Sequence, residues 1–139
     1  MDHLKGLNPA QLAAVEATEG PTMVIAGAGT GKTSTLAHRV ARLLLAGVPP
    51  ERMLLLTFTR RAALEMTRRA QKVMAEALAA QANSTTRVPD HLRLPWSGTF
   101  HSIGAKILRR HAELVGLKPN FTILDTDDQV RLMRQLIVA

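Results

Sequence analysis

A run of small residues near the N-terminus has the types and spacing needed to bind phosphate. The predicted binding residues are Ala26, Gly27, Ala28, Gly29, Thr30, Gly31, Lys32, Thr33 and Ser34. Glycines let the backbone bring several N–H groups against phosphate oxygens without clashes from Cβ atoms. Lys32 supplies a positive charge for the β- and γ-phosphates, and Thr33 offers a hydroxyl to Mg²⁺. This chemistry predicts a Walker A loop for ATP and Mg²⁺, with Lys32 and Thr33 as its catalytic residues.

The residues around this loop are of the kinds that such a loop requires. The apolar run Thr22–Ile25 predicts a short buried strand before it, and the apolar spacing over Ser34–Ala46 predicts a helix after it. The N-terminus of that helix adds the positive end of its dipole. The strict pattern begins with Gly where this chain has Ala26, so a glycine-rich turn with an exposed lysine remains the alternative.

Beyond the loop, the sequence alternates between predicted helices and strands. The remaining predicted elements are a helix over 9–18, a strand over 53–58, a helix over 60–81, a loop or insertion near 82–97, a strand end over 98–100, a helix over 101–115, an extended segment over 121–124 and a helix from a capping box at 126–129. The long helix carries an apolar stripe at Met66, Ala70, Val73, Met74 and Ala77. Strand, glycine loop, helix and strand form a βαβ unit, in which ligands bind at the carboxyl ends of the strands.

Composition and charge narrow the function classes. The chain has 139 residues, 46% of them apolar, which fits one domain with a core. Because it has no cysteine, a disulfide frame and a thiolate zinc site are excluded. Its apolar runs are too short to span a bilayer and its N-terminus lacks signal-peptide features, so we expect a soluble cytoplasmic protein without a membrane partner.

The positive charge is concentrated in the middle of the chain. Between Ser34 and Lys118 there are 14 basic and five acidic residues, and 13 of the 18 basic residues in the whole chain are arginine. Because the planar guanidinium suits phosphate, this excess favours a polyanionic partner. The alternative is a solvated basic face that binds nothing.

Four sequence blocks resemble superfamily 1 DNA helicases of the UvrD/Rep/PcrA type, in that family's order. Residues 7–15 with the glycine loop resemble the Q motif and motif I, residues 55–66 resemble motif Ia, residues 98–102 resemble motif Ib, and residues 121–129 have a counterpart just inside the 1B region. The family also has Ala at the first loop position. The resemblance implies a P-loop α/β fold with a RecA-like parallel sheet and flanking helices. Residues 1–117 would then belong to domain 1A, and residues 118–139 would begin the helical 1B subdomain.

The resemblance also implies roles around the nucleotide. Gln11 would hydrogen-bond the adenine edge, although Gln11 also fits the N3 position of a capping box with Asn8. Ser34 stands where the family often has an arginine close to the base. Arg39 is a candidate replacement for that arginine, but we favour the alternative that Arg39 is simply an exposed helix residue.

The motif Ia and Ib residues would line a track for single-stranded DNA. The predicted DNA-binding residues are Thr57, Phe58, Thr59 and Arg61, together with Thr99, Phe100, His101 and Ser102. Hydroxyls, arginine and histidine can bond phosphates, and an aromatic face stacks on a base without reading sequence. The alternative for each phenylalanine is core packing at a strand end. The implied partners are single-stranded DNA, single-strand/duplex junctions and the remaining helicase domains.

A catalytic carboxylate is missing from the expected position. Ile123-Leu124-Asp125 imitates a Walker B strand end, but Thr126 follows where the family's catalytic Glu should be. We therefore expect the N-terminal part of a longer ATP-dependent helicase that translocates 3′-to-5′ in DNA repair or replication. The alternatives are a RecB/AddA-type helicase–nuclease subunit, a P-loop small-molecule kinase, and a DNA-binding module with a vestigial nucleotide loop.

Overall fold

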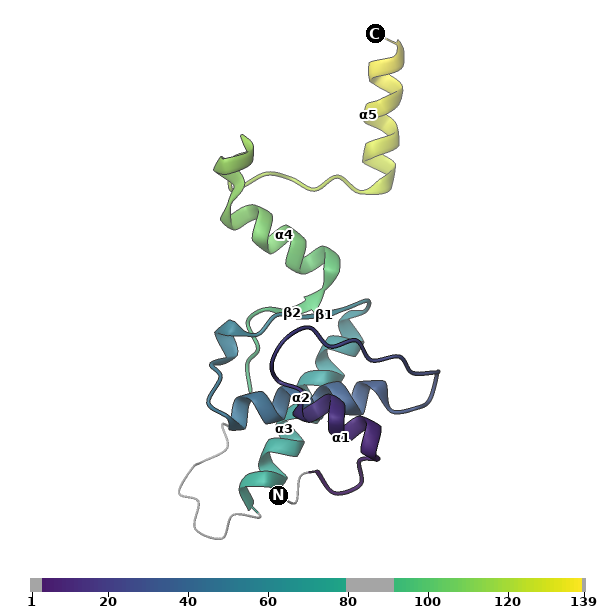
Figure 1. Cartoon of the computed structure of the whole chain (residues 1–139). Helices are drawn as coiled ribbons and strands as arrows, with labels where there is room; N and C mark the ends of the chain where they lie inside the picture. Colours follow the sequence, from purple (N-terminus) through teal and green to yellow (C-terminus); the bar gives the residue numbers. More distant parts are fainter. Residues whose placement is uncertain (1–3, 80–91, 139) are drawn as a thin grey trace. The chain divides into compact units, whose positions relative to one another are not determined.

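The computed structural model describes residues 4–79 and 92–138 (Figure 1). In chain order its elements are α1 (Pro9–Glu16), α2 (Lys32–Leu45), the 3-10 helix η2 (Pro50–Arg52), β1 (Leu55–Thr57), α3 (Arg60–Ala79), β2 (Ser97–Thr99), α4 (Phe100–Arg110), the 3-10 helix η3 (Ala112–Val115) and α5 (Thr126–Val138). The chain divides into two compact units, Met1–Ile103 and Gly104–Ala139. In the described part, no helix is both long enough and apolar enough to cross a membrane.

Strands β1 and β2 form a small parallel sheet in the first unit. Their register pairs Leu55 with Ser97 and Thr57 with Thr99, and the Leu55 N–H donates to the Trp96 carbonyl at 2.9 Å. A mixed helix and strand structure with a parallel pair confirms the predicted α/β class. Because parallel strands run in the same direction, the residues that follow Thr57 and Thr99 meet at one edge of the sheet.

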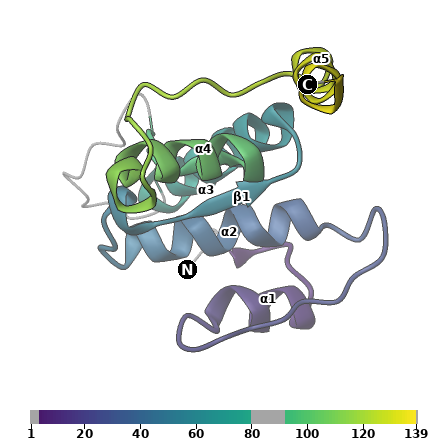
Figure 2. The same ribbon diagram turned by 90° about the horizontal axis from the view of Figure 1, so that it is seen from above.

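The core of the first unit lies between its helices and the sheet. Helix α2 lies between α1 and α3, and α3 also packs against both strands (Figure 2). Two clusters of buried side chains fill these contacts, namely Ala37, Val40, Leu55, Met66, Ala70 and Leu94 in one and Ala41, Val73 and Met74 in the other. All five residues of the predicted α3 stripe are buried. The alanines let α2 and α3 approach each other closely, and the larger side chains fill the remaining space.

The segment before the glycine loop is not the strand that its apolar residues predict. Residues 21–27 are irregular, and Met23 and Ile25 are 83% and 86% exposed. A strand needs a hydrogen-bonded neighbour, and no strand in the described ranges pairs with this segment. The apolar run correctly indicated the side-chain type, but it could not indicate the presence of a pairing partner.

Several element boundaries also differ from the sequence prediction. Helix α1 ends at Glu16 instead of Thr18, α2 begins two residues before Ser34, and the strand predicted over 53–58 is limited to 55–57. The helix predicted over 101–115 divides into α4 and η3 before Gly116, whose φ of 72° lies in the left-handed region. Most of the loop predicted near 82–97 lies outside the described residues, and its end at 97 belongs to β2.

In the second unit, residues 116–125 connect η3 to α5. The Arg109 guanidinium lies over the Phe121 ring, 5.3 Å from the ring centroid. Asp125 caps α5, because its side chain accepts from the Asp128 N–H at 2.8 Å and its carbonyl from the Gln129 N–H at 2.9 Å. The cap is therefore Asp125, one residue before the capping box predicted at 126–129.

Candidate nucleotide site and nucleic-acid interface

The glycine loop curls back on itself in front of α2. Gly29 and Gly31 have φ values of 73° and 85°, in the left-handed region that L-residues with a Cβ rarely adopt. The Thr30 hydroxyl donates to the Gly27 carbonyl at 2.6 Å and closes the turn. The sequence therefore provides glycine where the backbone must reverse, and a hydroxyl that closes the turn with a hydrogen bond.

The first turn of α2 is open to an anion. Gly31 is its N-cap residue and has no side chain to bond the first N–H groups, while its carbonyl accepts from the Thr35 N–H at 2.9 Å and the Thr35 hydroxyl at 3.0 Å. No acidic residue lies in this turn. The N–H groups of the first helical turn lack intrahelical acceptors and carry the positive end of the helix dipole. This arrangement suits a phosphate group.

Lys32 folds back over the loop. Its ammonium group donates to the Ala26 carbonyl at 3.1 Å and to the Gly27 carbonyl at 2.6 Å. The side chain is exposed, whereas Thr33 beside it is half-buried. A phosphate that enters the loop would therefore compete with two carbonyl oxygens for the Lys32 ammonium group.

Gln11 connects α1 to the glycine loop. Its Oε1 accepts from the Asn8 N–H at 3.0 Å, and the Asn8 Oδ1 accepts from the Gln11 N–H at 2.9 Å, so the capping box is confirmed. Its Nε2 also donates to the Thr30 carbonyl at 3.3 Å. A Cβ on Gly31 would lie 2.6 Å from that same nitrogen. Gln11 therefore caps α1 and also lies beside the glycine loop, and its contact with adenine stays a prediction.

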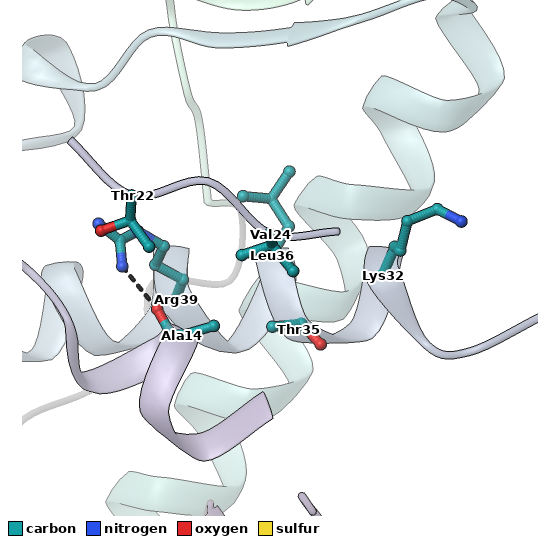
Figure 3. A pocket seen from close by; sticks show the side chains of 7 residues that line it. All are labelled: Ala14, Thr22, Val24, Lys32, Thr35, Leu36 and Arg39. Atoms are coloured by element: carbon teal, nitrogen blue, oxygen red, sulfur yellow. Dashed lines mark hydrogen bonds between the residues drawn. The ribbon is translucent and has the colours of Figure 1, made fainter. Parts of the chain in front are cut away.

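A cavity of about 300 Å³ lies beside the loop, between α1, the 22–24 segment and α2 (Figure 3). Its lining residues are Ala14, Thr22, Val24, Lys32, Thr35, Leu36 and Arg39. Arg39 is half-buried and donates to the Ala14 carbonyl at 2.6 Å, so the expectation of an exposed helix residue is wrong. Figure 3 shows the Lys32 side chain extending away from Arg39. Arg39 thus joins α2 to α1, a long-range contact that helix periodicity does not reveal.

Ser34, at the position of the family arginine, has its side chain beside another residue of α2. Its hydroxyl lies 3.5 Å from the His38 Nδ1, and its carbonyl lies 2.8 Å from the same nitrogen. Ser34 and His38 are both half-buried. Sequence reasoning missed His38, although its spacing four residues after Ser34 places both on one helix face.

Two phenylalanines meet at the edge of the sheet. Phe58 directly follows β1 and Phe100 directly follows β2, and their ring centroids are 5.4 Å apart at an angle of 46°. Phe58 is 91% exposed and Phe100 is 50% exposed. The alternative that both rings belong to the core is therefore wrong. The parallel register of Thr57 and Thr99 brings the two sequence blocks together.

The hydroxyl groups of the two blocks have local partners. The buried Thr57 hydroxyl lies 2.9 Å from the Thr59 carbonyl and 3.4 Å from the Gly98 carbonyl, while the Thr59 hydroxyl accepts from the Ala62 N–H at 3.1 Å. The Thr99 hydroxyl accepts from the Ser102 N–H at 3.2 Å. Thr59 and Thr99 thereby stabilise the first turns of α3 and α4. Arg61 and His101 are exposed in those same turns.

The family model for the UvrD/REP helicase N-terminal domain matches residues 7–139. The chain belongs to this family. It is 43% identical over 133 residues to the ATP-dependent DNA helicase PcrA of Leuconostoc citreum. It is 41% identical over 135 residues to the protein of that name from Staphylococcus aureus, and 39% identical over 135 residues to that from Bacillus subtilis.

These three alignments cover 95–96% of the chain but only 16–17% of each relative, so the chain spans about a sixth of the relatives' length. The resemblance expected from the four ordered blocks is confirmed over nearly the whole sequence. Membership of a helicase family also removes the small-molecule kinase from consideration, because that alternative predicted a lid and a substrate pocket in place of the two blocks after the loop.

Proposed function

We propose that this chain is the ATP-binding part of a DNA helicase whose full-length parent translocates 3′-to-5′ on single-stranded DNA and unwinds duplex in repair or replication. One observation carries the proposal: an uncapped helix N-terminus behind a glycine loop and an exposed phenylalanine pair occur in the same compact unit. The first feature suits a nucleoside triphosphate and the second suits unpaired bases. We assign residues 1–117 to a RecA-like 1A domain and residues 118–139 to the start of 1B.

In the proposed nucleotide complex, phosphate oxygens replace the carbonyl partners of Lys32. The ammonium moves from the Ala26 and Gly27 carbonyls to the β- and γ-phosphates, and the N–H groups of the loop and first turn of α2 complete the cradle. Gln11 already lies beside the loop through Thr30. Since its amide can donate and accept at once, it can pair with the adenine edge after small movements.

The residues present fit a magnesium ion that arrives with the nucleotide. Thr33 offers one oxygen at the start of α2, and the described ranges contain no group of three or more His, Cys, Asp or Glu side chains that could hold a metal. Mg²⁺ commonly takes one or two protein oxygens and completes its octahedron with phosphates and waters. When bound, it would neutralise charge on the phosphates, and Thr33 would orient it.

On the DNA side, we assign base stacking to the outer face of Phe58. A base inserted between two rings needs about 7 Å between them, twice the carbon contact distance, whereas the centroids of Phe58 and Phe100 are 5.4 Å apart. Phe100 therefore supports Phe58 from one side, and the base stacks on the other. Arg61 and His101 are the exposed polar groups available for phosphates in the adjoining first turns of α3 and α4.

Calorimetry with Mg·ATP tests the nucleotide assignment. Lys32→Ala should weaken binding by at least about tenfold, because a charge-assisted contact to phosphate is worth about 1.5–3 kcal/mol. Lys72→Ala is the matched control, since it removes the same charge from a side chain on α3 that is 78% exposed and only weakly paired with Glu76. Equal affinity in the wild-type chain and Lys32→Ala would reject the site.

A further inference from the structure

We propose that Ser102, Thr99 and Gly98 are positioning residues that hold Phe100 against Phe58 and so set the affinity for single-stranded DNA. In this role the two hydroxyls act through Phe100 and make no phosphate contact. The proposal rests on the DNA-binding function proposed above, and it reassigns two residues that the sequence placed on the DNA track.

The hydroxyl protons of Thr99 and Ser102 are both already used. The Thr99 hydroxyl donates to the Ser102 Oγ at 3.1 Å, and the Ser102 hydroxyl donates to the Thr99 carbonyl at 3.0 Å. Each hydroxyl has one proton, and a phosphate oxygen can only accept. Neither group can bond a phosphate without first breaking this closed pair. The Thr99 hydroxyl oxygen also accepts from the Ser102 N–H and so caps the first turn of α4.

Phe100 lies in the chain between the two residues of this hydrogen-bonded pair. It is the first residue of α4, directly after Thr99 and two residues before Ser102. The three hydrogen bonds fix the backbone on both sides of its Cα, which determines the direction in which the ring leaves the helix. The ring then reaches Phe58 at 5.4 Å while remaining half exposed. Loosening the pair should therefore disturb the support that Phe100 gives to Phe58.

Gly98 provides the space that the Ser102 hydroxyl occupies. A Cβ at residue 98 would lie 2.7 Å from the Ser102 Oγ, but 3.4 and 3.5 Å from two carbons of Ile103. Only the first contact is severe, so a side chain at residue 98 would displace the hydroxyl and leave Ile103 almost undisturbed. The carbonyl of Gly98 also lies 3.4 Å from the Thr57 hydroxyl, which donates to the nearer Thr59 carbonyl at 2.9 Å, so this strand lies against the one before Phe58.

The test measures binding of a labelled oligodeoxythymidylate to the 139-residue chain by fluorescence anisotropy. Ser102→Ala should weaken binding by about three- to tenfold, and Ser102→Thr should restore it because the hydroxyl is kept and the site is exposed. Ser97→Ala is the matched control on β2, since the Ser97 hydroxyl is buried and has no hydrogen-bond partner among the described residues. Emission from Trp96, the only tryptophan, reports whether β2 keeps its surroundings.

Two double-mutant cycles separate positioning from direct contact. In a Phe100→Ala chain, Ser102→Ala should cause no further loss, because the ring through which it acts is gone. Gly98→Ala should weaken binding in the wild-type background and cost nothing more in Ser102→Ala. An undiminished Ser102→Ala loss in Phe100→Ala would overturn the proposal, as would unchanged affinity in Gly98→Ala, which keeps both hydroxyls.

Failure of the underlying function gives a different result. If the wild-type chain does not bind the oligonucleotide, or if Phe58→Ala binds as tightly as wild type, the DNA assignment itself is wrong. If binding depends on Phe58 but the Ser102 and Phe100 effects simply add, only the positioning role is wrong.

Discussion

Replacing Phe58 by alanine should weaken binding of single-stranded DNA with little effect on folding. The Phe58 ring is 91% exposed, and it packs against the Phe100 ring. The loss of unfolding free energy should therefore stay within about 0.5–1.5 kcal/mol, the range for an aromatic pair. One stacked base is worth about 1–3 kcal/mol, which corresponds to an increase of about five- to 150-fold in the dissociation constant.

The salt dependence of binding separates stacking from charge. Phe58→Ala removes no charge, so the line of log K against log salt should move down with an unchanged slope. Anisotropy of a labelled oligodeoxythymidylate at several salt concentrations measures both quantities. Leu64→Ala, at a 61% exposed position on α3, is the control for a generic loss of exposed apolar surface. Equal losses in the two variants, or no loss in Phe58→Ala, would refute the stacking assignment.

Two further outcomes are expected at the nucleotide site. Gly31→Ala should weaken Mg·ATP binding in calorimetry and destabilise the chain by about 1–2 kcal/mol in denaturant titration. The reason is that the φ of Gly31 is 85° and the new Cβ would lie 2.6 Å from the Gln11 Nε2. Wild-type affinity and stability in this variant would contradict the loop geometry. The 139-residue chain should bind ATP without turning it over, because Asp125, its nearest imitation of a Walker B carboxylate, caps α5. Phosphate release that depends on Lys32 in the presence of single-stranded DNA would show that this chain has its own catalytic carboxylate.

The sequence predicted well those features that depend on local chemistry. The glycines with positive φ, the Asn8–Gln11 capping box and the buried stripe of α3 all follow from residue type and spacing over a few positions. These features need no knowledge of distant segments.

The features that the sequence did not predict depend on partners far along the chain or on individual protons. Residues 22–25 are apolar, but strand formation needs a neighbour that their own sequence does not specify. Arg39 bonds the Ala14 carbonyl 25 residues away. The Thr99 and Ser102 hydroxyls suggested phosphate contacts by type, yet the geometry commits both of their protons to each other and to the backbone.

Backbone amide shifts during titration with Mg·ATP test the central claim most directly, because they locate the nucleotide on the chain. The account predicts the largest shifts at Gly29, Gly31 and the first turn of α2, where the N–H groups face the proposed phosphates. The neighbouring cavity lined by Thr22, Leu36 and Arg39 should show smaller shifts. Shifts concentrated at that cavity, or none at saturating Mg·ATP, would contradict the assignment of the glycine loop as the ATP site.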